Sequence, residues 1–100
     1  MNTIQPAELA ALEDAVIIDV RQPEEYDAAH VDGARLVPLG ELVDRIGELP
    51  ADSTLYMMCR SGARSAQATA YLEAQGYDAV NVDGGIIAWY EAGLPIVQPD

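Results

Sequence analysis

Short apolar runs that favour β-strands alternate with helix-forming stretches along this chain, and this alternation limits the fold more than any other feature. The runs lie at 16–20, 54–58 and 79–82, and the first is apolar on both faces. Strands buried on both faces are typical of parallel sheets that carry helices on each side. We therefore expect one α/β domain over residues 1–100, with a parallel sheet of four or five strands and helices on both faces.

Five stretches between and around these runs favour helices. Pro6 stands where a helix can begin, 7–12 are helix formers, and the proline followed by acids at 23–26 predicts a second short helix. Apolar residues at helical spacing over 39–49, ended by Pro50, predict a surface helix. Residues 65–75, closed by Gly76, and 86–92, closed by Gly93, predict two more. Residues 35–37 form a candidate brief strand.

Charge and composition exclude several classes of function. The net charge is -12, with 17 acidic residues against five arginines and no lysine, which argues against nucleic-acid or anionic-membrane surfaces as partners. The sequence shows neither a secretory signal nor a membrane-spanning apolar stretch, so we expect a cytoplasmic protein. With one histidine, His30, and one cysteine, Cys59, we expect neither an internal disulfide nor a metal site, and no organic cofactor.

The single cysteine lies between a predicted strand and a predicted helix, at the start of the tight loop 59–65. In such a loop the backbone N–H groups can turn inward, and with the positive end of the following helix they bind anions. The same field lowers the pKa of a nearby thiol. We therefore predict that Cys59 is a nucleophile and that five residues bind its anionic substrate: Arg60, Ser61, Gly62, Ala63 and Arg64.

A cysteine at a strand end is otherwise more often a small buried apolar residue than a nucleophile. The residues that follow Cys59 change this balance, because a core cysteine needs no glycine turn bracketed by two arginines at a helix N-terminus. Positive charge on a first helical turn is also slightly unfavourable, which supports a ligand role for Arg64.

Several motifs in order resemble those of the rhodanese-like domain family over nearly the whole chain. They are Asp19-Val20-Arg21 with Glu25-Tyr26, His30-Val31-Asp32-Gly33-Ala34 leading to Pro38-Leu39, the 59–65 loop, and Asn81-Val82-Asp83-Gly84-Gly85-Ile86 followed by Ala88-Trp89 and Gly93-Leu94-Pro95. The resemblance implies that Cys59 forms a persulfide and that the backbone of 60–64 cradles the substrate. Ala29, where the family usually has glycine, lies outside the loop.

The activity that this resemblance implies is transfer of sulfane sulfur. The expected donor is thiosulfate, and the expected acceptor is cyanide or a thiol, including a thioredoxin-like or sulfur-carrier protein. No second cysteine can resolve the persulfide, so the acceptor must be external. Arg60 directly after the cysteine resembles members that use thiosulfate more than those that use mercaptopyruvate.

Two alternatives remain open. The family also includes dual-specificity phosphatases, whose loop places five residues between the cysteine and an arginine. Here four residues separate Cys59 from Arg64, and Ser65 stands at the arginine position, which argues against phosphatase chemistry. The other alternative is a binding or sulfur-relay module without catalysis of its own.

The remaining polar candidates are expected to support the site. We expect the predicted strand ends to share one edge of the sheet, which would bring Asp19 and Arg21 close to Cys59. A structural ion pair is the favoured role for those two residues. His30 is expected to organise its loop, Trp89 to lie in the core, and 83–85 to shape a turn beside the site.

Overall fold

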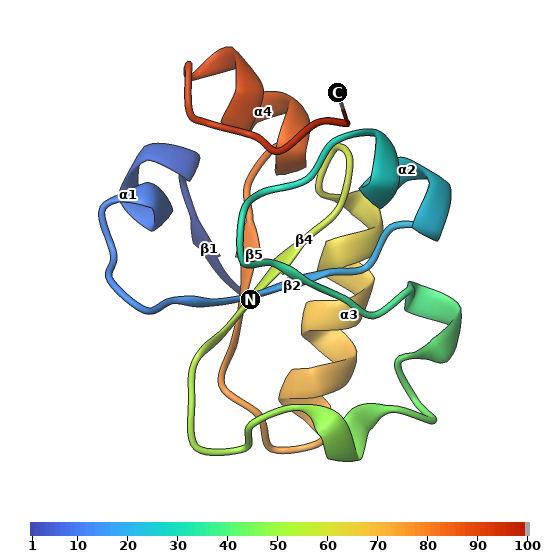
Figure 1. The fold of residues 1–100 in the computed structure, drawn as a ribbon. Coiled ribbons are helices and arrows are strands. Elements are labelled where there is room, and N and C mark those ends of the chain that lie inside the picture. Colours follow the sequence, from blue (N-terminus) through green and yellow to red (C-terminus); the bar gives the residue numbers. More distant parts are fainter. Residues whose placement is uncertain (100) are drawn as a thin grey trace.

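Five parallel strands form one sheet in the order β1-β5-β4-β2-β3 (Figure 1). The computed structural model describes residues 1–99. The strands are β1 (Asn2–Ile4), β2 (Val16–Asp19), β3 (Arg35–Leu36), β4 (Leu55–Met58) and β5 (Ala79–Val82). The helices are α1 (Pro6–Ala10), α2 (Pro23–Ala28), α3 (Ala63–Ala74) and α4 (Gly85–Glu91), with 3-10 turns η1 (Leu39–Glu41) and η2 (Ile46–Glu48). The expected α/β class with a parallel sheet is confirmed.

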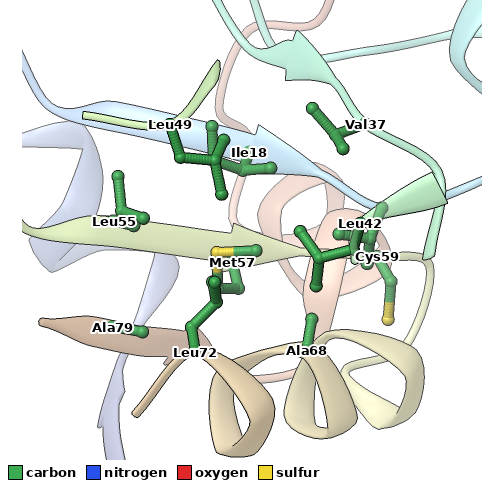
Figure 2. Close-up of a cluster of buried hydrophobic side chains, with 11 residues drawn as sticks. Ile18, Val37, Leu42, Leu49, Leu55, Met57, Cys59, Ala68, Leu72 and Ala79 are labelled. Atoms are coloured by element: carbon green, nitrogen blue, oxygen red, sulfur yellow. The ribbon is translucent and has the colours of Figure 1, made fainter. Parts of the chain in front are cut away.

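Each face of the sheet carries its own apolar core, and the alternation of side chains along β4 supplies both. Leu55 and Met57 point to the α3 side, and Met58 points to the side covered by α1 and α4. The α3 side, shown in Figure 2, contains Ile18, Val20, Val37, Leu42, Leu49, Leu55, Met57, Cys59, Ala68, Leu72 and Ala79. The opposite core contains Leu9, Ile17, Val31, Ala34, Met58, Val82, Ile86 and Trp89.

The predicted helix over 39–49 is wrong. The structure has only the two 3-10 turns η1 and η2 there, joined by hydrogen-bonded turns. Gly40 and Gly47 lower the helical propensity of this segment. The N–H of Leu39 is also bound to the carbonyl of Val20, which holds the segment along the sheet edge. Leu42 and Leu49 still reach the core, so the apolar spacing identified buried residues without identifying the backbone conformation.

Two other differences from the expected elements concern an additional strand and the start of a helix. Strand β1 was not predicted, because its three residues include the polar Asn2 and Thr3 and it pairs only with β5. Helix α3 begins at Ala63, two residues before the predicted start, so part of the candidate loop is already its first turn. No helix within residues 1–99 is long and apolar enough to cross a membrane.

The topology places the cysteine loop at a switch point of the sheet. The chain leaving β2 turns toward β3, whereas the chain leaving β4 turns toward β5 on the other side. In open parallel sheets, ligands bind at the carboxyl ends of the strands where the direction of winding reverses. Asp19 pairs with Met58 in register, so the end of β2 and the residue after β4 do share one edge, as expected.

Candidate active site

Cys59 directly follows β4 and continues the alternation of Leu55 and Met57, so its side chain lies on the α3 face of the sheet. Figure 2 shows the side chain at the end of β4, at the margin of the apolar cluster. The residue is 1% exposed. The loop residues Arg60, Ser61 and Ala63, in contrast, are exposed. The sulfur therefore lies just beneath the loop surface and against the start of α3.

Two hydrogen-bond donors point at the Cys59 sulfur. The backbone N–H of Gly62 lies 3.0 Å from Sγ, and the Ser65 hydroxyl lies 3.3 Å from it. Burial raises the pKa of the Cys59 thiol, but the Ser65 hydroxyl and the N–H groups of Ser65, Gly62 and Ser61 stabilise the thiolate more strongly, so the net pKa is lowered. The expected thiolate environment is thus built from neutral donors at the N-terminus of α3.

Helix α4 holds the backbone of the loop from behind. The N–H groups of Ile86 and Ile87 donate to the carbonyls of Cys59 and Arg60, at 2.9 and 3.1 Å. In a trans peptide the N–H points opposite to the carbonyl of the preceding residue. The N–H groups of Arg60 and Ser61 therefore face away from α4, and the inward-facing amides predicted for this loop depend on a helix that follows β5.

Two glycines allow this arrangement. Gly62 has φ +104°, and a Cβ built there would lie 3.4 Å from the backbone nitrogen of Gly84. Gly85 has φ +59°, and its Cβ would lie only 2.4 Å from the carbonyl oxygen of Cys59 and 2.6 Å from that of Arg60. Residues other than glycine rarely adopt such angles, and at Gly85 no side chain fits without moving the loop.

The two arginines of the loop have different surroundings. The Arg64 guanidinium makes two hydrogen bonds to the Glu25 carboxylate, at 2.7 and 2.9 Å. This bond to Arg64 is the main reason why the pKa of Glu25 is lowered to about 2. The Arg60 side chain is exposed and makes no hydrogen bond or ion pair with residues 1–99. Arg60 is thus the freer cation, whereas an anion bound by Arg64 would compete with Glu25.

Asp19 and Arg21 form the structural ion pair that we favoured. The Asp19 carboxylate is fully buried and accepts hydrogen bonds from Nε and Nη2 of Arg21, the shortest at 2.8 Å. Arg21 also donates to the carbonyls of Glu25 and Ala29. With these partners the pair fixes the connection from β2 through α2.

The other singled-out residues stabilise neighbouring segments. His30 Nδ1 lies 2.9 Å from the carbonyl of Tyr26, and the two rings stack with centroids 3.9 Å apart. Asp83 accepts a hydrogen bond from Gln5 Nε2 at 2.8 Å. Trp89 is buried in the α4-side core and donates to the carbonyl of Pro95.

Three residues of the site were not identified as such from the sequence. Ser65 entered only as the residue at the phosphatase arginine position, although a hydroxyl in the first turn after the loop was a signal for a contact with the sulfur. Glu25 was noted only as part of a motif, and its contact with Arg64 spans 39 residues. Gly85 was assigned to a turn, because the close approach of α4 to the loop leaves no local pattern.

Comparison with known proteins decides the family. The sequence profile of the Rhodanese-like domain matches residues 5–92. The chain belongs to the rhodanese-like family. Its fold agrees with a solved rhodanese-related protein from Thermoplasma volcanium, with a TM-score of 0.94 and 31% identity, covering 99% of this chain and 100% of that one.

Rhodanese-like relatives that resemble this chain include named sulfurtransferases. A sulfurtransferase of Allochromatium vinosum is 46% identical, over 92% of this chain and 87% of the relative. The thiosulfate sulfurtransferase GlpE of Pseudomonas putida is 37% identical, over 85% of this chain and 78% of the relative. The chain also matches 26% of the length of MoeZ of Mycobacterium tuberculosis, described as a probable adenylyltransferase/sulfurtransferase, at 41% identity. These relatives support a transferase within the rhodanese-like family.

Proposed function

We propose that this protein is a sulfurtransferase that carries sulfane sulfur on Cys59. The observation that supports this most directly is the pair of donors on the Cys59 sulfur, Gly62 N–H and the Ser65 hydroxyl, which stabilise a thiolate without a basic side chain. A thiolate is the form of cysteine that attacks a sulfur–sulfur bond. The GlpE relative, a thiosulfate sulfurtransferase, makes thiosulfate the first donor to test.

The proposed reaction has two covalent steps. The Cys59 thiolate attacks the outer sulfur of thiosulfate, a new sulfur–sulfur bond forms, and sulfite leaves with the electron pair of the broken bond. The persulfide then gives its outer sulfur to cyanide, forming thiocyanate, or to a thiolate, forming a new persulfide, and the Cys59 thiolate returns. The inward-facing N–H groups and Arg60 would stabilise the anionic groups in both steps.

The burial of Cys59 favours a small donor, because the residue is only 1% exposed, whereas the neighbouring loop residues Arg60, Ser61 and Ala63 are exposed. A second cysteine is absent from the sequence, so the acceptor must come from outside the chain. Small thiols and a thioredoxin-like or sulfur-carrier protein are the acceptors that we propose for the physiological reaction.

The first test is intact mass spectrometry after incubation with thiosulfate. We expect one added sulfur, removed by cyanide with release of thiocyanate, and no addition to the Cys59→Ser variant. A binding module would leave the wild-type mass unchanged with every sulfane donor. Hydrolysis of an aryl phosphate by the wild type, in the absence of sulfur addition, would instead support the phosphatase alternative.

A further inference from the structure

The carbonyl oxygen of Gly62 lies beside Cys59 and is approached by three hydrogen-bond donors. The N–H of Ala66 donates to it at 3.0 Å, the Ser65 hydroxyl lies 3.2 Å from it, and Asn81 Nδ2 lies 3.3 Å from it. A carbonyl oxygen has two lone pairs. The Ala66 bond, the first within α3, takes one of them, so Ser65 and Asn81 compete for the other.

The Ser65 hydroxyl has one proton and two acceptors within reach. The carbonyl oxygen of Gly62 lies at 3.2 Å, and the sulfur of Cys59 lies at 3.3 Å. Hydrogen bonds from a hydroxyl to oxygen are usually about 2.7–2.8 Å long, so the contact with Gly62 is stretched. Sulfur is a larger atom, for which 3.3 Å is an ordinary distance. The Ser65 hydroxyl can therefore donate its proton to the Cys59 sulfur as long as another donor binds the Gly62 carbonyl.

Asn81 is the side chain placed to be that donor. It lies on β5 and is 7% exposed, and its Nδ2 lies 3.3 Å from the Gly62 carbonyl oxygen. This contact is also longer than the usual distance of about 2.9–3.0 Å, but Nδ2 makes no other hydrogen bond among residues 1–99. Its Oδ1 is buried and has no hydrogen-bond partner among residues 1–99. A buried acceptor without a partner lowers the stability of the fold. The favourable interaction of this side chain is therefore the hydrogen bond that its Nδ2 donates to Gly62.

We propose that Asn81 is a positioning residue for Cys59. Its amide donates a hydrogen bond to the Gly62 carbonyl oxygen, so that the Ser65 hydroxyl is left to donate to the cysteine sulfur. The role deepens the proposed function, because it matters for turnover only if Cys59 is the nucleophile. Asn81 touches neither the sulfur nor a substrate in this arrangement and acts through Ser65 alone.

The charged groups around Cys59 would not account for a change in its protonation when Asn81 is replaced. Arg64 acts electrostatically on Cys59 and Asp19, but Arg64 is paired with Glu25 and Asp19 is paired with Arg21. Helix α4 contributes no charged side chain before Glu91. Every variant below leaves unchanged the charged residues that end or follow β2, β4 and β5, and the partner of Arg64: Asp19, Arg21, Glu25, Arg60, Arg64 and Asp83.

The experiment is the pH dependence of Cys59 alkylation by iodoacetamide in the full chain, followed by mass. The variants are Asn81→Ala and Asn81→Val, the second filling more of the space with a residue that suits a strand. We expect the midpoint of the pH profile, which reports the pKa of the thiol, to rise by about half a unit, so that alkylation below the midpoint slows about threefold. We expect the midpoint of urea unfolding to stay equal or to rise, because the unpaired oxygen is removed.

Three further variants separate this role from general loosening of the loop. Ser65→Ala should raise the pH midpoint by itself, and adding Asn81→Ala to it should produce no further rise. Thr69→Val is the matched control, because the buried Thr69 hydroxyl donates at 2.7 Å to the carbonyl of Ser65 and bonds neither the Gly62 carbonyl nor the sulfur. It should lower stability and leave the pH midpoint unchanged.

An unchanged midpoint in both Asn81 variants overturns the proposal, as does an equal rise when Asn81→Ala is added to Ser65→Ala. A rise of the same size in Thr69→Val would also overturn it. Alkylation needs no sulfur donor, so a wild-type protein that forms no persulfide would refute sulfur transfer and leave this comparison of midpoints intact.

Discussion

The connections that follow β2 and β4 occupy equivalent places in the sheet, but the anionic group in each has different partners. Both leave a central strand at the carboxyl edge of the sheet and enter a helix within four residues. After β2, the buried Asp19 carboxylate is neutralised by Arg21. After β4, the donors to the Cys59 sulfur among residues 1–99 are neutral groups, Gly62 N–H and the Ser65 hydroxyl.

This difference separates a carboxylate held in an ion pair from a sulfur without a counter-ion, which is what the proposed sulfur transfer needs. A carboxylate bound to its own guanidinium has its donors in place and is unavailable to a ligand. A thiolate stabilised by neutral donors has no counter-ion to displace, and its lowered pKa increases the fraction of thiolate near neutral pH at some loss of intrinsic nucleophilicity. Arg64, the cation in the first turn of α3, is bound to Glu25 and makes no hydrogen bond to the sulfur, which keeps the two kinds of site apart.

Removing the cation after β2 should have the largest effect. In Arg21→Met the Asp19 carboxylate stays buried without its counter-ion, and we expect the free energy of unfolding in urea to fall by about 3–5 kcal/mol. Arg45→Met is the control, because Arg45 forms exposed ion pairs with Glu41 and Glu48 and its loss should change stability little. Equal losses in the two variants would contradict the structural role assigned to the buried pair.

Crowding the loop after β4 should cause the second largest loss of stability. Gly85→Ala places a Cβ against the carbonyls of Cys59 and Arg60, and we expect unfolding to become easier by about 2–3 kcal/mol. Gly76→Ala is the matched control, because Gly76 also has positive φ, +89°, but has no atom within 4 Å of the added Cβ. It should lose only about 1 kcal/mol from backbone strain. Urea titrations of both variants that coincide would show that α4 does not constrain the loop.

A smaller effect should distinguish the two exposed arginines, Arg60 in the loop after β4 and Arg35 on strand β3. Arg60→Gln removes the free cation of the loop. We expect persulfide formation at low thiosulfate to slow about fivefold, because the variant loses one charge-assisted hydrogen bond to the bound anion, which contributes roughly 1 kcal/mol at an exposed site. Arg35→Gln, on β3, changes the net charge equally and should leave the rate close to wild type. The rate is measured from the mass shift over time, and similar slowing in both would point to net charge instead.

The smallest effect should come from Glu25. Its lowered pKa means that the Arg64 pair stabilises the fold above the ordinary value of 4.5 and that this contribution is lost as the pH falls through about 2. The pair is partly exposed, so we expect less than about 1 kcal/mol. Glu25→Gln should therefore flatten the fall in unfolding free energy between these pH values, whereas the exposed Glu24→Gln should follow the wild type. Parallel curves for Glu25→Gln and wild type would refute the contribution.

Much of this molecule was predictable because its signals are local. The apolar runs located β2, β4 and β5, and the closing glycines located the ends of α3 and α4. The sequence around Cys59 indicated a strand, a loop and a helix in that order. The segment 39–49 shows the limit of such reasoning. Its apolar spacing correctly marks Leu42 and Leu49 as buried, but the same spacing fits two 3-10 turns held along the sheet.

The amino-acid sequence by itself determined the α/β class, the parallel sheet and the cysteine at a strand end, since each depends on residues within a few positions of one another. Only the tertiary structure decided which groups surround that cysteine. Asn81 reaches the loop from the neighbouring strand β5, Gly85 reaches it from the start of α4, and Glu25 reaches Arg64 from α2. Such contacts are created by strand order and register, which bring distant segments within hydrogen-bonding distance without leaving any periodic pattern in the sequence.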